Sequence, residues 1–277
     1  MSVATVFGVS LLCFTLACSP EVTPRGDSFV GDFETGNFDQ WENCQNIVVT
    51  SGPCVNYPKP NDSMRVERSV VRQGQYGARF EVRQGDMPAE LCCGDRAEVS
   101  GGEATRADEG DERWYQWSTR FEGGFPADQG WSVLSQWHAD EDGPPPLAIA
   151  AGPTNVENDH WGLVISTWWA PGNPGPTYTP WRTRIVPDIW NDIKLHVRWS
   201  ARDSAGFVEL WVGGERQMFD AAPCYGQLRC TVRTLMPRGG GVYFKQGYYR
   251  DPEIGPQGVV YHDGFSSAAT EAGLEPL

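Results

Sequence analysis

The chain has 277 residues, with 36 acidic and 22 basic side chains and a formal net charge of −14. This balance argues against nucleic-acid binding, because contacts with phosphates need a basic surface. Hydrophobic residues make up 40% of the chain, enough for a packed core, while 32 glycines and 21 prolines are too many for a helical bundle.

The N-terminal segment is the long apolar run of the sequence. It covers residues 3–17, which is short for a membrane span and typical of a signal peptide. The letters LACS at 16–19 resemble a bacterial lipoprotein cleavage box, in which Cys18 would carry the lipid. We expect a signal peptide over 1–17 and a tether over 18–28. The protein would then be exported, and either secreted or anchored at the bacterial cell envelope through Cys18.

The six cysteines that follow Cys18 indicate disulfide bonds, since their number is even and the chain is expected to be exported. They are Cys44, Cys54, Cys92, Cys93, Cys224 and Cys230. The pairings that close short loops are Cys44–Cys54 and Cys224–Cys230. Six cysteines allow about fifteen connectivities, so these pairings are a preference.

Residues 29–277 show strand patterns and Gly/Pro turns with no linker that would separate domains. Apolar and polar residues alternate over 79–82, 114–121, 193–199 and 207–212. The last of these runs into Gly213-Gly214, a hairpin turn signal. The Pro- and Trp-rich segment 139–182 is poorly periodic, and we expect long loops there. This pattern predicts one all-β domain, an antiparallel sandwich or jelly roll.

Polar side chains share a face on two predicted strands, because residues two apart on a strand point the same way. Arg96 and Glu98 form one such pair, and Gln136 and His138 form another. A solvated outer face would explain either pair alone.

A third strand, over 242–250, places Tyr243 and Lys245 on one face. Tyr249 has the same parity, and Gly247 between them could bend or bulge the strand. Together the three strands supply cationic, donor-rich and titratable groups within an acidic protein, which suits an anionic ligand.

Such a set of groups fits β-elimination on a uronic-acid polymer. Arg96, Gln136 and His138 could neutralise the sugar carboxylate and so stabilise an enolate-like intermediate. Tyr249 could transfer protons if nearby cations such as Lys245, Arg250 or Arg96 lowered its pKa. His138 is the alternative base.

Three segments resemble the signature strands of the jelly-roll polysaccharide lyases. They are RAEV at 96–99, QWH at 136–138 and YFKQGYYRD at 243–251. These lyases include alginate lyases, fungal glucuronan lyase and the heparin lyase I-like group. The opening GDFETG at 31–36 and the closing VYHDGF at 260–265 are most similar to the last group, so the resemblance spans about residues 30–266.

The resemblance implies an antiparallel β-sandwich jelly roll with a concave substrate groove, and a role for each matching residue. Tyr249 would be the catalytic acid/base and His138 the partner base or neutraliser, while Arg96 and Gln136 hold the carboxylate and Lys245 assists. The remaining substrate contacts would come from Glu98, Trp137, Tyr243 and Arg250. Trp168, Trp169 and Trp181 are further candidates for stacking on sugar rings.

The resemblance also bears on cofactors and partners. Catalysis would need no cofactor, but Glu34 and Asp263 lie where related jelly rolls bind a structural Ca²⁺ between the first and last strands. The partner would be an acidic polysaccharide, with a carboxylate-only polymer such as glucuronan or alginate favoured over heparin because the chain has only three lysines. We expect a monomer.

Two other functions remain open. A non-catalytic carbohydrate-binding sandwich would need a groove and aromatic side chains but not Tyr249 beside Lys245. A glycoside hydrolase would need two carboxylates that flank the scissile bond. The acidic run at 108–112 lies in a Gly-containing turn and lacks that same-face spacing.

Overall fold

The computed structural model describes residues 1, 28–47, 52–54, 63–88, 93–170 and 172–277. Two short 3-10 segments lie entirely within these ranges, η2 (Gly102–Thr105) and η3 (Glu271–Gly273). The expected signal peptide, Cys18 and the tether lie outside the described residues, apart from Met1 and Ser28. The described part contains no helix with the length and apolar character needed to cross a membrane.

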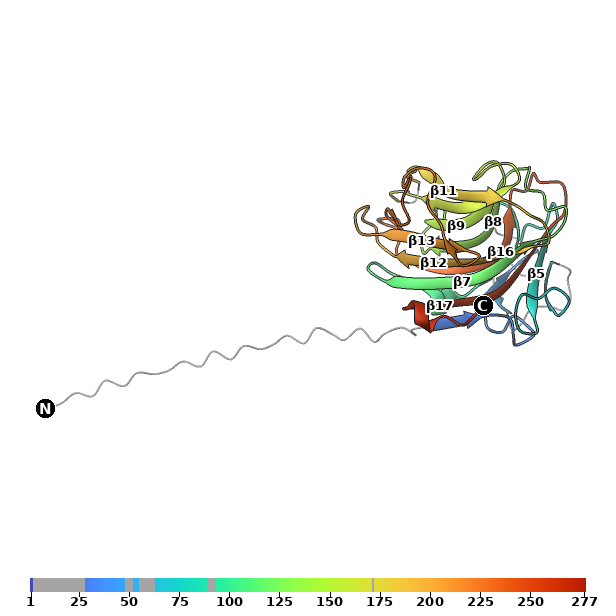
Figure 1. Ribbon diagram of the computed structural model, residues 1–277, viewed down its shortest axis with the longest axis horizontal. Coiled ribbons are helices and arrows are strands. Elements are labelled where there is room, and N and C mark those ends of the chain that lie inside the picture. Colours follow the sequence, from blue (N-terminus) through green and yellow to red (C-terminus); the bar gives the residue numbers. More distant parts are fainter. Residues whose placement is uncertain (2–27, 48–51, 55–62, 89–92, 171) are drawn as a thin grey trace.

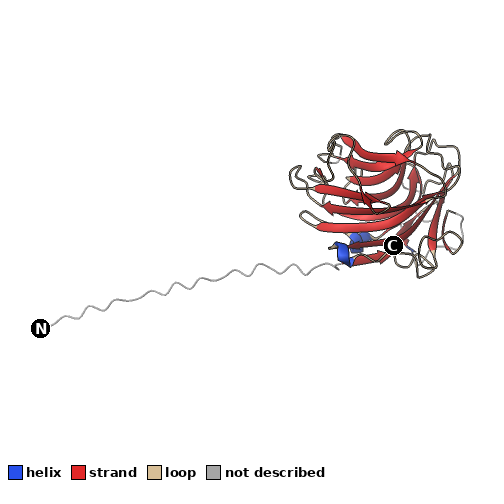
Figure 2. Cartoon of the chain, in the orientation of Figure 1, coloured by secondary structure: helices blue, strands red, loops and turns tan. Residues whose placement is uncertain are grey.

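Two antiparallel sheets form a sandwich, with curved strands in both layers (Figures 1 and 2). The described strands of the first sheet follow the order β14–β13–β12–β7–β17–β5–β4, and β1 and β15 pair with β17 and β13. Their bounds are β1 (Ser28–Gly31), β4 (Met64–Glu67), β5 (Gly77–Val82), β7 (Glu112–Phe121), β12 (Trp190–Arg198), β13 (Phe207–Val212), β14 (Glu215–Arg216), β15 (Cys230–Thr231) and β17 (Gly258–Ala268). The all-β jelly-roll prediction is confirmed.

The second sheet carries the three polar strands side by side. Its described strands follow the order β11–β10–β9–β8–β16–β6–β2–β3. Their bounds are β2 (Asn43–Gln45), β3 (Gly52–Pro53), β6 (Asp95–Ser100), β8 (Ser132–Ala139), β9 (Leu147–Ala151), β10 (His160–Ser166), β11 (Thr177–Arg184) and β16 (Val242–Arg250). Because β16 pairs with β6 on one side and with β8 on the other, segments far apart in sequence become neighbours.

An aromatic core fills the space between the sheets. Phe244 of β16 stacks on Phe265 of β17 with ring centroids 4.1 Å apart, and Trp137 of β8 packs edge-on against Tyr115 of β7 at 5.0 Å. All four side chains are at most 1% exposed. Strands β6, β8 and β16 therefore present one face to this core and the opposite face to the cleft described below.

Two local predictions are confirmed. Gly213 and Gly214 connect β13 to β14 with φ of 59° and 82°, a left-handed conformation that glycine adopts at little cost. Disulfides join Cys44 to Cys54 and Cys224 to Cys230, whereas Cys92 lies outside the described residues.

The expectation of long loops over 139–182 is wrong, because this segment contains β9, β10 and the beginning of β11. Strand β9 has the sequence LAIAA and is buried on both faces. Leu147 and Ile149 enter the main core, while Ala148 and Ala150 pack in a second apolar cluster. A strand buried on both faces has no polar alternation, so the period-two signal is missing.

Candidate active site

The five predicted catalytic side chains line one cleft of about 690 Å³ on the second sheet. They are Arg96 of β6, Gln136 and His138 of β8, and Lys245 and Tyr249 of β16. Strand register explains why they meet. Tyr249 lies opposite Arg96, and Lys245 lies opposite Gln136. Directly opposed residues have neighbouring side chains on the same face of the sheet.

A β-bulge interrupts β16 between Gln246 and Tyr249, where its register with β8 shifts. Gly247 lies within this bulge with φ of 148°, and an added Cβ would lie only 2.2 Å from the Ala97 carbonyl oxygen. The bulge expected at Gly247 is therefore present. Register with β6 continues through this region, so Lys245 and Tyr249 stay on the cleft side.

Beneath the bulge, His262 of the opposite sheet holds the Gly247 carbonyl. Its Nε2–H donates to this oxygen at 2.9 Å, and its Nδ1 lies 3.0 Å from Thr119 Oγ1. Burial lowers the pKa of His262 to about 4, so the imidazole stays neutral in this contact. His262 itself is fully buried.

Glu98 is the carboxylate around which the polar side chains of the cleft are arranged. Gln136 Nε2 donates to Glu98 Oε1 at 2.6 Å, and Lys245 Nζ donates to Glu98 Oε2 at 2.7 Å. Arg96 lies 3.5 Å from the same Oε2. Burial would raise the pKa of Glu98, but the charges of Lys245 and Arg96 outweigh it and lower that pKa. Glu98 is 2% exposed with both oxygens bound, so it supports the cleft from beneath, whereas the sequence predicted a substrate contact.

His138 has one ring nitrogen committed to the backbone. Its Nδ1 lies 2.6 Å from the Ala139 carbonyl oxygen, an acceptor, so Nδ1 carries the proton. The lone pair of the neutral ring is therefore on Nε2. Burial, followed by the charge of Lys245, lowers the pKa of His138 below 6.5. The ring is then a neutral base at neutral pH.

Tyr249 lies between a guanidinium and an indole. The Arg96 guanidinium carbon is 3.9 Å from the centre of the Tyr249 ring, and Trp131 packs edge-on at 4.6 Å. The sequence reasoning had made proton transfer by this phenol conditional on a lowered pKa. Burial instead raises the pKa of Tyr249 above 10, because it outweighs the opposing effect of Arg96. The phenol therefore stays protonated and is an acid in its resting form.

Two predicted substrate contacts are wrong. Trp137 is 0% exposed and lies in the aromatic core, because it alternates with Gln136 and His138 on β8. Arg250 is also 0% exposed and donates to the Pro256 carbonyl oxygen at 2.5 Å. Arg250 is adjacent to Tyr249 on β16, so its side chain points to the face of the sheet opposite the cleft. By contrast, Tyr243 lines the cleft and stacks on His138 at 5.4 Å.

The aromatic wall of the cleft differs from the expected set. Trp168 lines it, whereas Trp181 is 7% exposed in the core and Trp169 lies under the Arg233 guanidinium at 3.7 Å. Trp131 also lines the cleft and was missed. The sequence could have indicated Trp131, because it lies two residues before Val133, which faces the cleft as well.

A second, smaller cavity of about 270 Å³ adjoins the cleft. Both are lined by Gln45, Tyr243 and Lys245. The sequence reasoning did not identify this extension, because its residues come from four separate segments. Its lining is Glu42, Asn43, Gln45, Ser100, Gly102, Glu103, Arg106, Asp140, Tyr243 and Lys245.

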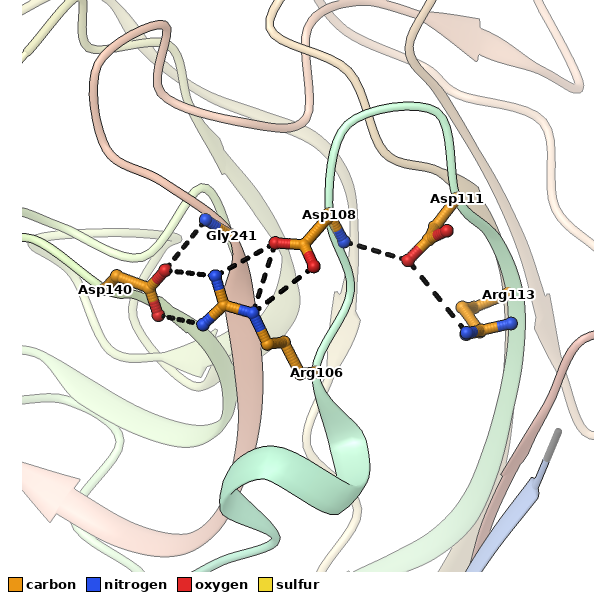
Figure 3. Close-up of polar contacts among 6 residues, drawn as sticks. All are labelled: Arg106, Asp108, Asp111, Arg113, Asp140 and Gly241. Carbon is orange, nitrogen blue, oxygen red and sulfur yellow. Dashed lines mark hydrogen bonds and ion pairs between the residues drawn. The ribbon is translucent and has the colours of Figure 1, made fainter. Parts of the chain in front are cut away.

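Arg106 joins three chain segments at the end of this cavity (Figure 3). It donates to Asp108 at 2.9 Å and to both oxygens of Asp140 at 2.5 Å, and Asp140 also accepts the Gly241 N–H at 3.0 Å. Asp140 begins the loop whose next residues, 142–145, form a wall of the main cleft. Arg106 therefore fixes the position at which this loop begins.

The two residues predicted to bind calcium both contact the loop at 72–76. Glu34 accepts the N–H groups of Gln75 and Tyr76 at 3.0 Å, and Asp263 Oδ2 accepts that of Arg72 at 2.7 Å. Asp263 Oδ1 is buried and has no hydrogen-bond partner among the described residues, so this oxygen could serve as a calcium ligand. The described residues form no group of three or more metal-binding acidic, His or Cys side chains. The calcium site stays a prediction.

Comparison with known proteins gives one family and several solved structures of similar fold. The family model described as polysaccharide lyase matches residues 33–266. No curated protein sequence matches the chain.

Among solved structures, the endo-β-1,4-glucuronan lyase from the fungus Trichoderma reesei is similar with a TM-score of 0.65 at 15% identity, over 91% of this chain and 98% of that one. A family 7 alginate lyase in complex with product gives 0.60 at 11% identity, over 86% and 99%. The alginate lyase from Corynebacterium sp. gives 0.54 at 13% identity, over 86% and 98%. At these identities the likeness shows a shared fold.

Proposed function

The chain belongs to the polysaccharide lyase family, and from this premise we propose that it cleaves a uronic-acid-containing polysaccharide by β-elimination. The products would be a new reducing end and a 4,5-unsaturated uronide. The observation that carries this proposal is the cleft in which a neutral imidazole and a protonated phenol accompany carboxylate-binding donors.

The carboxylate of the bound uronate would be held by Arg96 and Gln136. Gln136 uses one N–H hydrogen for Glu98 and has a second available, since its amide carries two. Lys245 adds positive charge from its fixed position on Glu98. Neutralising the carboxylate makes the adjacent C5 proton more acidic and stabilises the enolate-like intermediate.

Proton transfer would then use two different groups. His138 Nε2 takes the C5 proton, and the C5–H electron pair forms the C4=C5 double bond as the C4–O4 bond breaks. The Tyr249 hydroxyl gives its proton to the leaving O4. The phenolate left on Tyr249 regains a proton from solvent, and imidazolium returns its proton to solvent. The reaction consumes no water and needs no redox partner.

Product analysis tests this proposal against its two alternatives. The protein is incubated with alginate, glucuronan, hyaluronan, heparan sulfate and heparin while ultraviolet absorbance and reducing ends are followed. A lyase gives both signals, a hydrolase gives reducing ends alone, and a binding module gives neither. The described lining of the main cleft includes a single carboxylate, Asp142, which disfavours the two-carboxylate chemistry of a hydrolase.

We also propose that the chain is exported, and either secreted or anchored at the bacterial cell envelope through a lipidated Cys18. The support is the apolar segment at 3–17, the letters LACS at 16–19, and the two disulfides. Metabolic labelling of the unaltered protein and of a Cys18→Ala variant with a fatty acid tests the attachment.

The predicted calcium site is tested by thermal unfolding. The unaltered protein and the Asp263→Asn variant are each titrated with calcium, and their unfolding temperatures are compared.

A further inference from the structure

Trp168 lies in the cleft wall at the end of the second sheet where β8 ends and β9 begins. It follows Ser166, the last residue of β10, by two positions, and Ile165 of that strand lies opposite Leu147, the first residue of β9. Leu147 in turn lies opposite Trp137 of β8. Trp168 is half-buried and lines the same cleft as the proposed catalytic groups. A flat ring at this position can stack on a sugar bound beside those groups.

Arg233 contacts the chain on both sides of Trp168. Its Nη2 donates to the Thr167 carbonyl oxygen at 2.7 Å, and its guanidinium carbon lies 3.7 Å from the centre of the Trp169 ring. Arg233 is 4% exposed, whereas Trp169 is 50% exposed, so the ring covers the guanidinium. The arginine is thus held by the two residues that flank Trp168 in the sequence.

The segment that carries Arg233 is attached to the first sheet. It follows β15, which pairs with β13. The Val232 N–H donates to the carbonyl oxygen of Gly206, just before β13, at 3.0 Å. The Thr234 N–H donates to that of Ser200, just after β12, at 2.9 Å. Arg233 therefore connects the first sheet to the part of the cleft wall that contains Trp168.

The ion pair of Arg233 does not explain its burial. Nη1 lies 3.6 Å from Oδ2 of Asp203, whose side chain is 64% exposed, and a pair of this kind contributes little in solvent. Nη1 and Nε have no hydrogen-bond partner among the described residues. The close contacts are those with Thr167 and Trp169, which suit a planar guanidinium that donates at its edge and stacks on its face.

Removal of Arg233 should weaken the support of Trp168 without opening the loop around it. Thr167 is 4% exposed, so its carbonyl group would lose a donor where water has little access. The base of the loop would stay closed, because the Thr167 N–H and hydroxyl donate to the Pro176 carbonyl oxygen at 2.9 and 2.8 Å. The orientation of the Trp168 ring would become less fixed.

We propose that Arg233 is a positioning residue for the substrate, which holds Trp168 in the orientation that stacks on a sugar. This proposal rests on the proposed function and adds to it a residue that acts on binding. Arg233 is absent from the described lining of the cleft, so its effect must pass through Trp168. Its loss should raise KM and leave kcat nearly unchanged, since the catalytic groups belong to β6, β8 and β16.

Steady-state kinetics test the proposal on whichever of alginate, glucuronan, hyaluronan, heparan sulfate and heparin gives unsaturated product fastest. We expect Trp168→Ala to raise KM about tenfold and Arg233→Leu about fivefold, the latter with kcat within about twofold. The matched control is Arg229→Leu, because Arg229 also lies over a ring, that of Phe207 at 4.0 Å, but does not line the cleft. An unchanged KM in Arg233→Leu, or an equal rise in the control, would overturn the proposal.

Arg233→Lys separates positioning from charge. Lysine keeps the positive charge but lacks the planar group that stacks on Trp169, so KM should stay about threefold above that of the unaltered protein. If Arg233 acted only by attracting an anionic polymer, this variant would have an unaltered KM, and the proposal would be wrong.

A double variant shows whether the effect passes through Trp168. In the Trp168→Ala background, Arg233→Leu should raise KM no further, because residues that act through one another are not additive. Two independent effects that multiply would refute the proposal. If Arg233→Leu does not fold, as judged by circular dichroism, Trp169→Ala replaces it, since this change removes the covering ring from an exposed position. It should raise KM about threefold, and an unchanged KM would refute the proposal.

A binding measurement separates this proposal from that of the lyase reaction. Tyr249→Phe, with and without Arg233→Leu, is titrated calorimetrically with glucuronan and alginate hexasaccharides. Binding that is weaker by about fivefold in the double variant supports the role of Arg233, whether or not turnover is detected. Equal binding, or no binding of either hexasaccharide by Tyr249→Phe, refutes it. Absence of unsaturated product from every polymer would instead refute the lyase proposal.

Discussion

Glu98 shows how a single buried residue organises the cleft. Its carboxylate has no solvent to stabilise it, and it is held by Gln136, Lys245 and Arg96. These contacts fix the positions of the groups that we propose to bind the substrate carboxylate. A preorganised charge of this kind does not need to reorient during the reaction, which is why it can lower the barrier.

Removing the phenolic hydroxyl at position 249 should abolish proton donation to the leaving oxygen. We expect Tyr249→Phe to lower kcat by about a thousandfold, with little change in KM, since general acid catalysis contributes about 10²–10⁴-fold. The rate at which unsaturated product forms, followed by ultraviolet absorbance, measures this effect. Circular dichroism of the variant checks its fold, and wild-type turnover in a folded variant would contradict the assigned role.

The pH profile of kcat/KM should reflect two shifted groups. His138 must be neutral to act as a base, and its pKa lies below 6.5, so activity should rise with pH through an acidic midpoint. Tyr249 must be protonated to act as an acid, and its pKa lies above 10, so activity should fall only at alkaline pH. A lower midpoint above 6.5, or an upper one below 10, would argue against these assignments.

At the scale of elements, β16 serves the core and the cleft at once. Phe244 points into the aromatic core, whereas Lys245 lines the cleft, as the strand alternation requires. The bulge at Gly247 lies between Lys245 and Tyr249, and His262 from β17 holds the carbonyl of this glycine. The position of the catalytic phenol thus depends on a contact that crosses the sandwich.

Replacing His262 tests whether this contact positions Tyr249. We expect His262→Leu to lower kcat about tenfold with a smaller effect on KM, because the Gly247 carbonyl loses its donor and the bulge is less constrained. His262→Gln retains an N–H donor and should recover part of the loss. If both variants lose stability without any change in kcat, the contact is structural only.

At the scale of the whole molecule, the aromatic core holds the two sheets together. Phe244 is 0% exposed and contacts rings from both layers, including Phe265 at 4.1 Å and Trp137 at 5.1 Å. These contacts join β16 to β17 and β8. The cleft strands are therefore supported by the same packing that stabilises the sandwich.

Replacing Phe244 with a smaller side chain should remove a large part of the free energy of unfolding. We expect Phe244→Ala to lower the free energy of unfolding by about 3–5 kcal/mol, the usual range for a large aromatic side chain removed from a core. Urea unfolding followed by tryptophan fluorescence measures the change. Phe244→Leu, which leaves a smaller cavity, should lose clearly less, and equal losses would argue against a cavity effect.

The sequence predicted much of this arrangement because strands have a period of two. Alternation put Arg96 with Glu98 and Gln136 with His138, and the structure places three of these side chains on the cleft with Glu98 beneath them. The same rule, applied consistently, would have removed Trp137 and Arg250 from the site. It failed for β9, where both faces are buried and no alternation is present.

By itself the sequence determined the fold class, the cleft strands and the side chains that they share, because these follow from local periodicity and motif spacing. Only the tertiary structure decided the protonation states and the extension of the cleft. The pKa values of His138 and Tyr249 depend on burial by other strands. The extension joins Glu42, Glu103 and Asp140, whose proximity comes from strand pairing and loop contacts between distant segments.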